Sequence, residues 1–331
     1  MKLFTKKTIP TLLLAGMTLP MTAFATNGYF SHGYGLKAKS MGGVGVAAPF
    51  DSLAAATNPA GMATIGSRYD LGIDYFRPVR YATGTNVAEG NGALNASDFN
   101  ARSSANDFFI PEIGYNTMLS DHLAVGVSIV GNGGMNTTYR NKNFFDVGPS
   151  KDQNASVGVD LSQLIILPTL AYKIDSTNSS GKVTATNSFG VSPILAYQVF
   201  KAFGLGDFGS FGFSKDPNHL TDKGHDSSYG AGIRLGWQGH FFDDRLSLGA
   251  TWASKAYMTR FEDYRGLFAE GGDFDIPENY AIGITMKPTQ NLLMAFDIEK
   301  ILYSEVASIA NRTPPNCFQG TLGCTASQPV G

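Results

Sequence analysis

The chain has 331 residues and a formal net charge of −2; 39 residues are glycine, 12% are aromatic and only 16% are charged. Charged residues make up about 25% of an average soluble domain, so this composition is unusual for a water-soluble protein. A nearly neutral chain also lacks the general electrostatic attraction that nucleic-acid binding requires. Low charge with abundant Gly, Phe and Tyr instead suits a membrane barrel, and the expected partners are outer-membrane lipid and apolar solutes.

Residues 1–25 have the order of features that an export signal requires. A basic head with three lysines precedes an apolar core around residues 12–14, and Ala23-Phe24-Ala25 ends the segment with small residues. A membrane anchor is the alternative, but this core is far shorter than the ~20 residues that a spanning helix needs. We therefore predict a signal peptide at 1–25.

The next stretch, 26–66, is rich in glycine and does not alternate between apolar and polar residues. Asp51 or Ser52 can act as the N-cap of a short Leu/Ala helix. Pro59 is expected to end that helix, because proline disfavours helical geometry in the residue before it. A segment of this length in front of a barrel can fold back into the lumen, so we predict a plug, or hatch, with short helices at 26–66.

The rest of the chain, 67–331, alternates with period two, as strands do. Apolar residues such as Tyr229, Ile233 and Leu235 share one parity, and the opposite parity carries Arg234 and Gln238. This pattern suits a wall with lipid outside and a polar lumen inside, and it predicts an all-β fold, a transmembrane antiparallel β-barrel. About nine segments show it, near 69–77, 108–117, 123–129, 164–174, 189–199, 229–241, 246–252, 274–286 and 292–298.

Short and long connections follow one another in strict order along these segments. The short ones are 119–121, 175–186, 242–245 and 288–290, and the long ones are 82–105, 141–157, 204–227 and 262–271. Outer-membrane barrels have short periplasmic turns and long external loops, so the order predicts a location in the outer membrane of a Gram-negative bacterium. An odd strand count would leave an unpaired edge in lipid. We therefore expect a C-terminally truncated chain; a miscount of strands is the alternative.

Two motifs in the hatch carry a family resemblance. The run HGYGLKAKSMGGVGVA, followed by DSLAAATNPAGMA, resembles the hatch of the outer-membrane long-chain fatty acid transporter family, which also includes aromatic hydrocarbon uptake channels. Asn58, Pro59 and Ala60 match the family's NPA motif. The resemblance implies a barrel of fourteen strands, so that about a third of the wall would be missing here. It also implies passive uptake of long-chain fatty acids or other hydrophobic compounds, with capture in external loops, gating by the hatch and sideways exit through a kinked wall strand.

Two further candidate sites follow from the resemblance. The wall kink is expected at Gly131, Gly133 and Gly134, because the family's kink lies in the third strand; the alternative is that these glycines begin the next external loop. The capture site is expected in the loop that carries three aromatic residues, Phe208, Phe211 and Phe213, which otherwise form part of an interfacial aromatic girdle. We expect a monomer without cofactor or metal.

Charged residues on the lumen parity have two possible uses. Arg234, Lys255 and Lys287 could attract a carboxylate, but pairing with Asp275, Asp297 and Glu299 in an internal polar network is the preferred interpretation. The two cysteines, Cys317 and Cys324, are expected to form a disulfide in an exported protein, with two free thiols as the alternative.

Competing functions have weaker support. A barrel lipase or protease would need a Ser, His and Asp arrangement at the outer rim, where only His219 and His225, close to Asp226 and Ser227, qualify. No nucleophile motif accompanies them, so we expect no enzyme. A general porin or adhesin would have an open lumen, and the sequence leaves open which hydrophobic ligand is carried.

Overall fold

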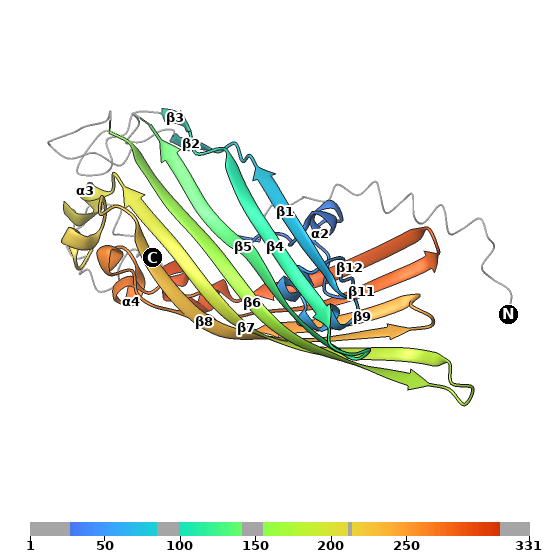
Figure 1. Ribbon diagram of the computed structural model, residues 1–331. Coiled ribbons are helices and arrows are strands. Elements are labelled where there is room, and N and C mark those ends of the chain that lie inside the picture. Colours follow the sequence, from blue (N-terminus) through green and yellow to red (C-terminus); the bar gives the residue numbers. More distant parts are fainter. Residues whose placement is uncertain (1–26, 85–98, 141–154, 211–213, 312–331) are drawn as a thin grey trace, which may run out of the picture.

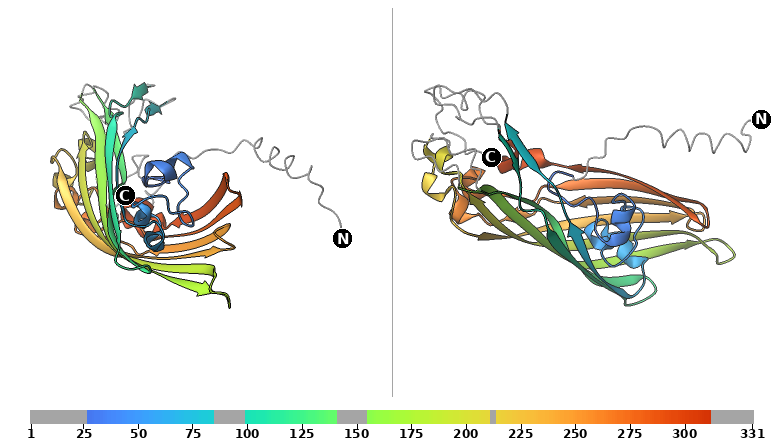
Figure 2. Two further views of the ribbon diagram at one scale, coloured as in Figure 1. Left: turned by 45° about the vertical axis from the view of Figure 1, so that its right-hand side comes forward. Right: turned by 90° about the horizontal axis from the view of Figure 1, so that it is seen from above.

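The chain folds into a strongly curled antiparallel sheet, and the N-terminal segment lies inside the concave face of that sheet (Figures 1 and 2). The computed structural model describes residues 27–84, 99–140, 155–210 and 214–311. The predicted signal peptide at 1–25 and both Cys317 and Cys324 lie outside the described residues.

Nine strands of the described residues follow one another across the sheet in the order β1-β4-β5-β6-β7-β8-β9-β11-β12, and neighbours pair antiparallel. The all-β prediction with about nine wall strands is therefore confirmed. Their bounds are β1 Arg68–Phe76, β4 Phe108–Met118, β5 Leu123–Tyr139, β6 Val157–Thr177, β7 Val183–Phe203, β8 Asp226–Phe241, β9 Leu246–Ala253, β11 Asn279–Thr289 and β12 Leu292–Ile301. Three short strands complete the sheets: β2 Tyr81–Gly84 with β3 Phe99–Arg102, and β10 Tyr257–Met258 beside β8.

The helical segments of the described residues are all short. Those of the hatch are α2 Leu36–Ser40, η1 Ala54–Ala56 and η2 Pro59–Ala63. Those of the connections are α3 Gly206–Ser210, η3 Pro217–His219, η4 Glu262–Tyr264, α4 Ala269–Gly272, η5 Tyr303–Glu305 and α5 Ala307–Ala310. Within the described ranges, no helix is long and apolar enough to cross a bilayer.

The sheet is apolar on its outside and polar on its inside, the reverse of a soluble protein. In β8, Tyr229 is 60% exposed and Leu235 43% exposed, whereas Arg234 and Gln238 of the other parity are buried. The same alternation exposes apolar residues along the other strands, among them Leu71, Ile73, Phe296 and Ile298. A surface this rich in large exposed apolar side chains is the one expected to face hydrocarbon.

The connections divide the molecule into two ends. Turns of a few residues join β4 to β5, β6 to β7, β8 to β9 and β11 to β12 at what we call the short-turn end. The opposite, long-loop end carries the segments between β7 and β8 and between β10 and β11, together with α3 and α4 (Figure 1).

Three local expectations are wrong. Phe274 is expected in a strand, but β11 begins only at Asn279; Ile276 forms a single antiparallel bridge with Ala256, and Pro277, which has no N–H to donate, interrupts the ladder after it. Pro59 does not simply end a helix: it begins η2, since proline suits the first position of a helical segment. Asp51 is not the N-cap of η1, because Leu53 occupies that position without a side-chain bond; the Asp51 carboxylate instead accepts from the Leu53 N–H at 3.0 Å, in the turn before the helix.

Candidate functional site

The candidate site is the interior of the curled sheet, which the described part of the hatch, residues 27–66, occupies (Figure 2). The centre of the hatch consists of small or flexible apolar side chains that are fully buried, among them Ala55, Ala60 and Met62. These residues pack against the inner faces of β5, β6, β7 and β8. The hatch therefore fills the interior of the sheet. In a soluble protein, large apolar side chains of the sheet itself would fill this space.

Glycines of the wall allow the hatch backbone to approach closely. A Cβ atom at Gly190 of β7 would overlap with the backbone of Pro59, and one at Gly236 of β8 would overlap with the side-chain oxygen of Asn58. Gly249 of β9 stands in the same relation to the backbone of Val46. A high glycine content suits a barrel in general, and the positions of Gly190, Gly236 and Gly249 show that these glycines make room for the hatch.

The NPA motif lies where the hatch meets β8. Asn58 is 1% exposed, and its amide nitrogen donates to the main-chain oxygens of Val46 at 2.7 Å and Trp237 at 2.9 Å. Its amide oxygen accepts from the Ala60 N–H at 3.1 Å and thereby caps η2. All hydrogen-bonding groups of this buried amide are thus used: two bonds lie within the hatch, and the one to Trp237 joins the hatch to the wall.

Carboxylates of the wall bind main-chain N–H groups of the hatch. Asp70 of β1 accepts from the Ser52 N–H at 2.9 Å and from its hydroxyl at 2.7 Å. Asp297 of β12 accepts from the N–H groups of Gly45 at 2.8 Å and Val46 at 2.9 Å. These bonds are charge-assisted and attach the hatch to both edges of the described sheet.

A buried ion cluster holds the first helix of the hatch. Lys39 of α2 contacts Glu112 of β4 at 2.6 Å and Asp74 of β1 at 3.0 Å. Glu112 also accepts from the Gly35 N–H at 3.1 Å, and its side chain is only 4% exposed. Breaking this cluster costs free energy, because removal of one partner leaves the other as an unpaired charge in the lumen.

The predicted pairing of lumen charges is only partly observed. Lys255 contacts Asp275 at 3.6 Å. Arg234, by contrast, donates to the Thr57 oxygen at 3.0 Å and lies 3.4 Å from the Asn279 side chain, so its contacts join wall and hatch instead of forming an ion pair. Asp297 likewise binds the hatch backbone. The alternation of apolar and polar residues predicts that Arg234 and Asp297 face the lumen. It does not predict which hatch groups they bind.

The glycines proposed as a wall kink lie inside β5, and not in the following loop. The register of β5 against β6 shifts between Gly131 and Gly133, so Asn132 is an extra residue in the strand. The start of the hatch occupies this bulge: the Ser31 N–H donates to the Asn132 oxygen at 2.8 Å, and the Gly134 N–H donates to the Tyr29 oxygen at 3.1 Å.

Eight rings form an aromatic cluster between the long-loop end and this bulge. Centroids of adjacent rings in the cluster lie 4.7 to 5.9 Å apart, which is the range of favourable aromatic pairs. The cluster forms a continuous apolar column with its inner end beside β5. Its members are Tyr29, Phe30, Phe200, Phe261, Tyr264, Phe268, Phe274 and Tyr303.

Burial disfavours the ionised form of two tyrosines of the hatch. It raises the pKa of Tyr29 and of Tyr34 above the ordinary range of a phenol, because the charged form is disfavoured away from water. The Tyr34 hydroxyl donates to the Asn132 side-chain oxygen at 2.8 Å, so this neutral group also contacts the β5 bulge.

The proposed capture loop is described only in part. Phe208 lies half-buried in α3, whereas Phe211 and Phe213 fall outside the described residues. The loop is attached to the aromatic cluster, since the Tyr264 hydroxyl donates to the Gly224 oxygen at 2.6 Å. The Ser214 hydroxyl donates to the Gly266 oxygen at 2.7 Å in the same region.

The described histidines of the outer loops pair with carboxylates and not with a nucleophile. His219 pairs with Asp216 at 2.9 Å and His225 lies 3.4 Å from Asp160, and within the described residues neither ring hydrogen-bonds to a serine hydroxyl. In the described ranges, no group of His, Cys, Asp and Glu side chains could hold a metal ion.

Comparisons with known proteins agree with the fold. Residues 13–323 match the model of the family described as outer membrane protein transport protein (OMPP1/FadL/TodX). Two crystal structures of the Pseudomonas putida toluene transporter TodX are similar, each with a TM-score of 0.58. They are 20% and 19% identical, cover 84% and 83% of this chain, and are each covered over 72% of their own length. The comparison with curated proteins gives no match.

Proposed function

The chain belongs to the OMPP1/FadL/TodX family of Gram-negative outer membrane transport proteins, and on this basis we propose that it is a passive channel for hydrophobic compounds. The short-turn end then faces the periplasm and the long-loop end faces outward. The observation that carries the proposal is the filled lumen, in which the hatch fits against wall glycines at backbone distance. A general porin needs a water-filled lumen, whereas a channel for hydrophobic ligands does not.

The proposed route begins in the outward loops. The loop of Phe208, Phe211 and Phe213 captures the ligand, and the aromatic cluster offers it an apolar surface further in. Each Å² of apolar ligand surface that is removed from water contributes about 25 cal/mol of favourable free energy. Binding along the route therefore draws the ligand inward without an energy source. Because the rings are packed against one another, the ligand has to displace side chains in order to pass.

The proposed exit is the bulge of β5. Bulges interrupt ladder pairing, and here the hatch residues Tyr29 and Ser31 contact the strand where it is interrupted. Withdrawal of this hatch segment would open the wall beside Asn132. The ligand would then enter the lipid sideways, without crossing the periplasm-facing hatch.

A monoaromatic hydrocarbon is the second candidate ligand. It is supported by the aromatic character of the cluster and by the similarity to TodX, a toluene transporter. Fatty acids and hydrocarbons both need apolar surface, so they share the route and differ only in a charged head group.

The proposal is tested by uptake in cells that lack their own channel of this kind. Cells producing the chain should take up radiolabelled oleate, toluene or both, with or without an uncoupler of the membrane potential. Deletion of Asn132, which restores the β5 register, should reduce uptake while the protein still assembles. Uptake equal to that of cells without the chain, or high ion conductance of the purified protein in planar bilayers, would reject the proposal in favour of a porin.

A further inference from the structure

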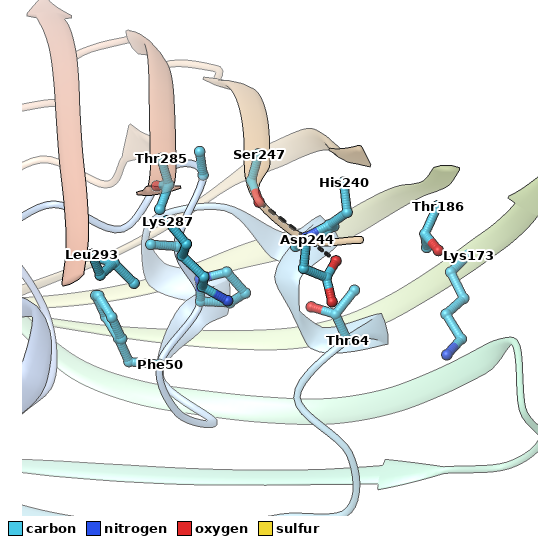
Figure 3. A pocket seen from close by; sticks show the side chains of 13 residues that line it. Phe50, Thr64, Lys173, Thr186, His240, Asp244, Ser247, Thr285, Lys287 and Leu293 are labelled. Atoms are coloured by element: carbon cyan, nitrogen blue, oxygen red, sulfur yellow. Dashed lines mark hydrogen bonds and ion pairs between the residues drawn. The ribbon is translucent and has the colours of Figure 1, made fainter. Parts of the chain in front are cut away.

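A cavity of about 410 Å³, which we call the chamber, lies at the short-turn end (Figure 3). The hatch segment 47–50 forms one side of it, and residues at the ends of β6, β7, β8, β9, β11 and β12 form most of the rest. The route proposed above leaves the lumen through β5 and does not use the chamber. What the chamber contains therefore needs a separate explanation.

Two buried polar atoms of the chamber have no partner among the described residues. Thr285 of β11 is 3% exposed, and its hydroxyl oxygen makes no hydrogen bond within the described part of the chain. On β8, Nδ1 of His240 lies 3.0 Å from the Ser247 hydroxyl, whereas Nε2 of the same ring is buried without a described partner. Both side chains line the chamber (Figure 3). Buried polar groups are almost always hydrogen-bonded, so these atoms point to a bound molecule that supplies the bonds.

The chamber also contains two ammonium groups. Lys173 of β6 and Lys287 of β11 line it, and across the described ranges no carboxylate lies within ion-pair distance of either amine. Asp244, the acid of the lining, lies 3.4 Å from Nδ1 of His240 instead. A lysine ammonium group is compact and strongly hydrated, so an unpaired one keeps water around it. The charged lining therefore favours a wet space over a dry one.

We propose that the chamber is a hydration site, in which bound water bridges Thr285 and His240 to the hydroxyl and ammonium groups around them. Water both donates and accepts, so it satisfies a hydroxyl and either tautomer of His240, whereas an anion only accepts. A buried water makes about three hydrogen bonds, and this polar lining offers that number. Lys287 is exposed, so the chamber exchanges its water with the solvent at the short-turn end.

This inference goes beyond the proposed function, because it makes the chamber a barrier and not a part of the route. The aromatic cluster offers an apolar solute ring surface. Entry into the chamber would instead strip water from two ammonium groups and leave the Thr285 hydroxyl without a partner, which costs free energy. An apolar solute in the lumen is thus kept from a straight path past the hatch, and the bulge of β5 remains its exit.

The first test uses Thr285→Val, which replaces the hydroxyl by a methyl group of nearly the same shape. Loss of a water-bonded hydroxyl leaves that water short of a partner, so the unfolding equilibrium constant of the full chain, measured by urea titration in lipid vesicles, should rise about fivefold. A buried hydroxyl without any partner is itself unfavourable, so a constant that stays the same or falls overturns the proposal. Thr289→Val, at the exposed end of the same strand, is the matched control and should change the constant by less than about twofold.

The second test locates the water directly. A crystal structure of the full chain, at a resolution that shows ordered water, should have water within about 3.2 Å of the Thr285 hydroxyl and of Nε2 of His240. Xenon binds dry apolar cavities, so crystals pressurised with xenon should show no xenon atom in the chamber. Xenon or a detergent tail beside Thr285, or no water at either atom, overturns the proposal. Neither measurement requires transport, so the inference can fail while the channel stands.

Discussion

The side-chain amide of Asn58 donates a hydrogen bond to the main-chain oxygen of Trp237, 2.9 Å away, and so joins the hatch to a wall strand 179 residues later in the sequence. Gly236, the neighbour of Trp237, permits this contact because a Cβ there would overlap with the Asn58 oxygen. Movement of the hatch must therefore break a buried amide contact. The strength of the Asn58–Trp237 contact therefore helps to set the free energy needed to move the hatch out of the lumen.

Replacement of Asn58 by alanine should loosen the hatch. The variant leaves the buried Val46 oxygen and the Ala60 N–H without their partner, which costs about 1 to 3 kcal/mol of unfolding free energy. Asn58→Asp should cost more, since a carboxylate would face two carbonyl oxygens. Urea titration in lipid vesicles, followed by tryptophan fluorescence, measures both effects. Asn291→Ala in the exposed turn between β11 and β12 is the control, and an equal loss there would contradict the assigned role.

Replacement of Gly236 by alanine should displace the hatch by overpacking. The added Cβ overlaps with the side-chain oxygen of Asn58, and overpacking of this kind costs about 1 to 3 kcal/mol. We also expect higher ion conductance in planar bilayers, because a displaced hatch opens the lumen to water. Gly206→Ala adds the same atom in α3, where no heavy atom lies within 4 Å, and should leave conductance unchanged. Equal conductance of the two variants would contradict the fit described here.

The sequence predicts the wall much better than it predicts the contents of the lumen. Alternation depends only on neighbouring residues, so the parity of Leu235 and Arg234 could be read directly and the structure confirms it. It also assigned Phe274 to a strand, since one apolar residue at the right parity looks the same in a ladder and in a packed loop.

Contacts between hatch and wall could not be predicted in this way. Gly190 and Gly236 look like ordinary strand glycines, and only the folded chain shows that they face Pro59 and Asn58. The NPA motif was recognisable by resemblance, but the partner of its asparagine is a main-chain oxygen, which leaves no mark in the sequence. The same holds for Asp297, whose partners are the N–H groups of Gly45 and Val46.

Stability of the long-loop end should depend on the ionisation of Asp273. Burial, together with the nearby Asp275 and Glu270, raises the pKa of Asp273 to about 6 in the folded protein. A raised folded pKa means that the native state holds this proton more tightly than the unfolded chain does. Protonated Asp273 therefore stabilises the folded state below about pH 4. This stabilisation is lost as the pH rises through about 6, and it amounts to on the order of 1 kcal/mol after solvent screening.

Asp273→Asn checks this dependence. The variant should unfold at a higher temperature than the parent at about pH 8, and the difference should shrink as the pH falls below the raised pKa. Asp121→Asn, in an exposed turn at the opposite end, provides a control with the same change of charge. A pH-independent difference between Asp273→Asn and the parent would show that the substitution acts through packing instead of through the proton.

Removal of the charge on Lys39 should release the first helix of the hatch. Lys39→Met leaves Glu112, whose side chain is 4% exposed, with the Gly35 N–H as its remaining hatch donor. We expect a loss of about 1 to 3 kcal/mol in unfolding free energy, because a buried carboxylate loses its cation. Adding Glu112→Gln should recover part of this loss, since the amide carries no charge. The double-mutant cycle, measured by urea titration, isolates the pair: additive effects of the two substitutions would mean that the 2.6 Å contact contributes nothing to hatch docking.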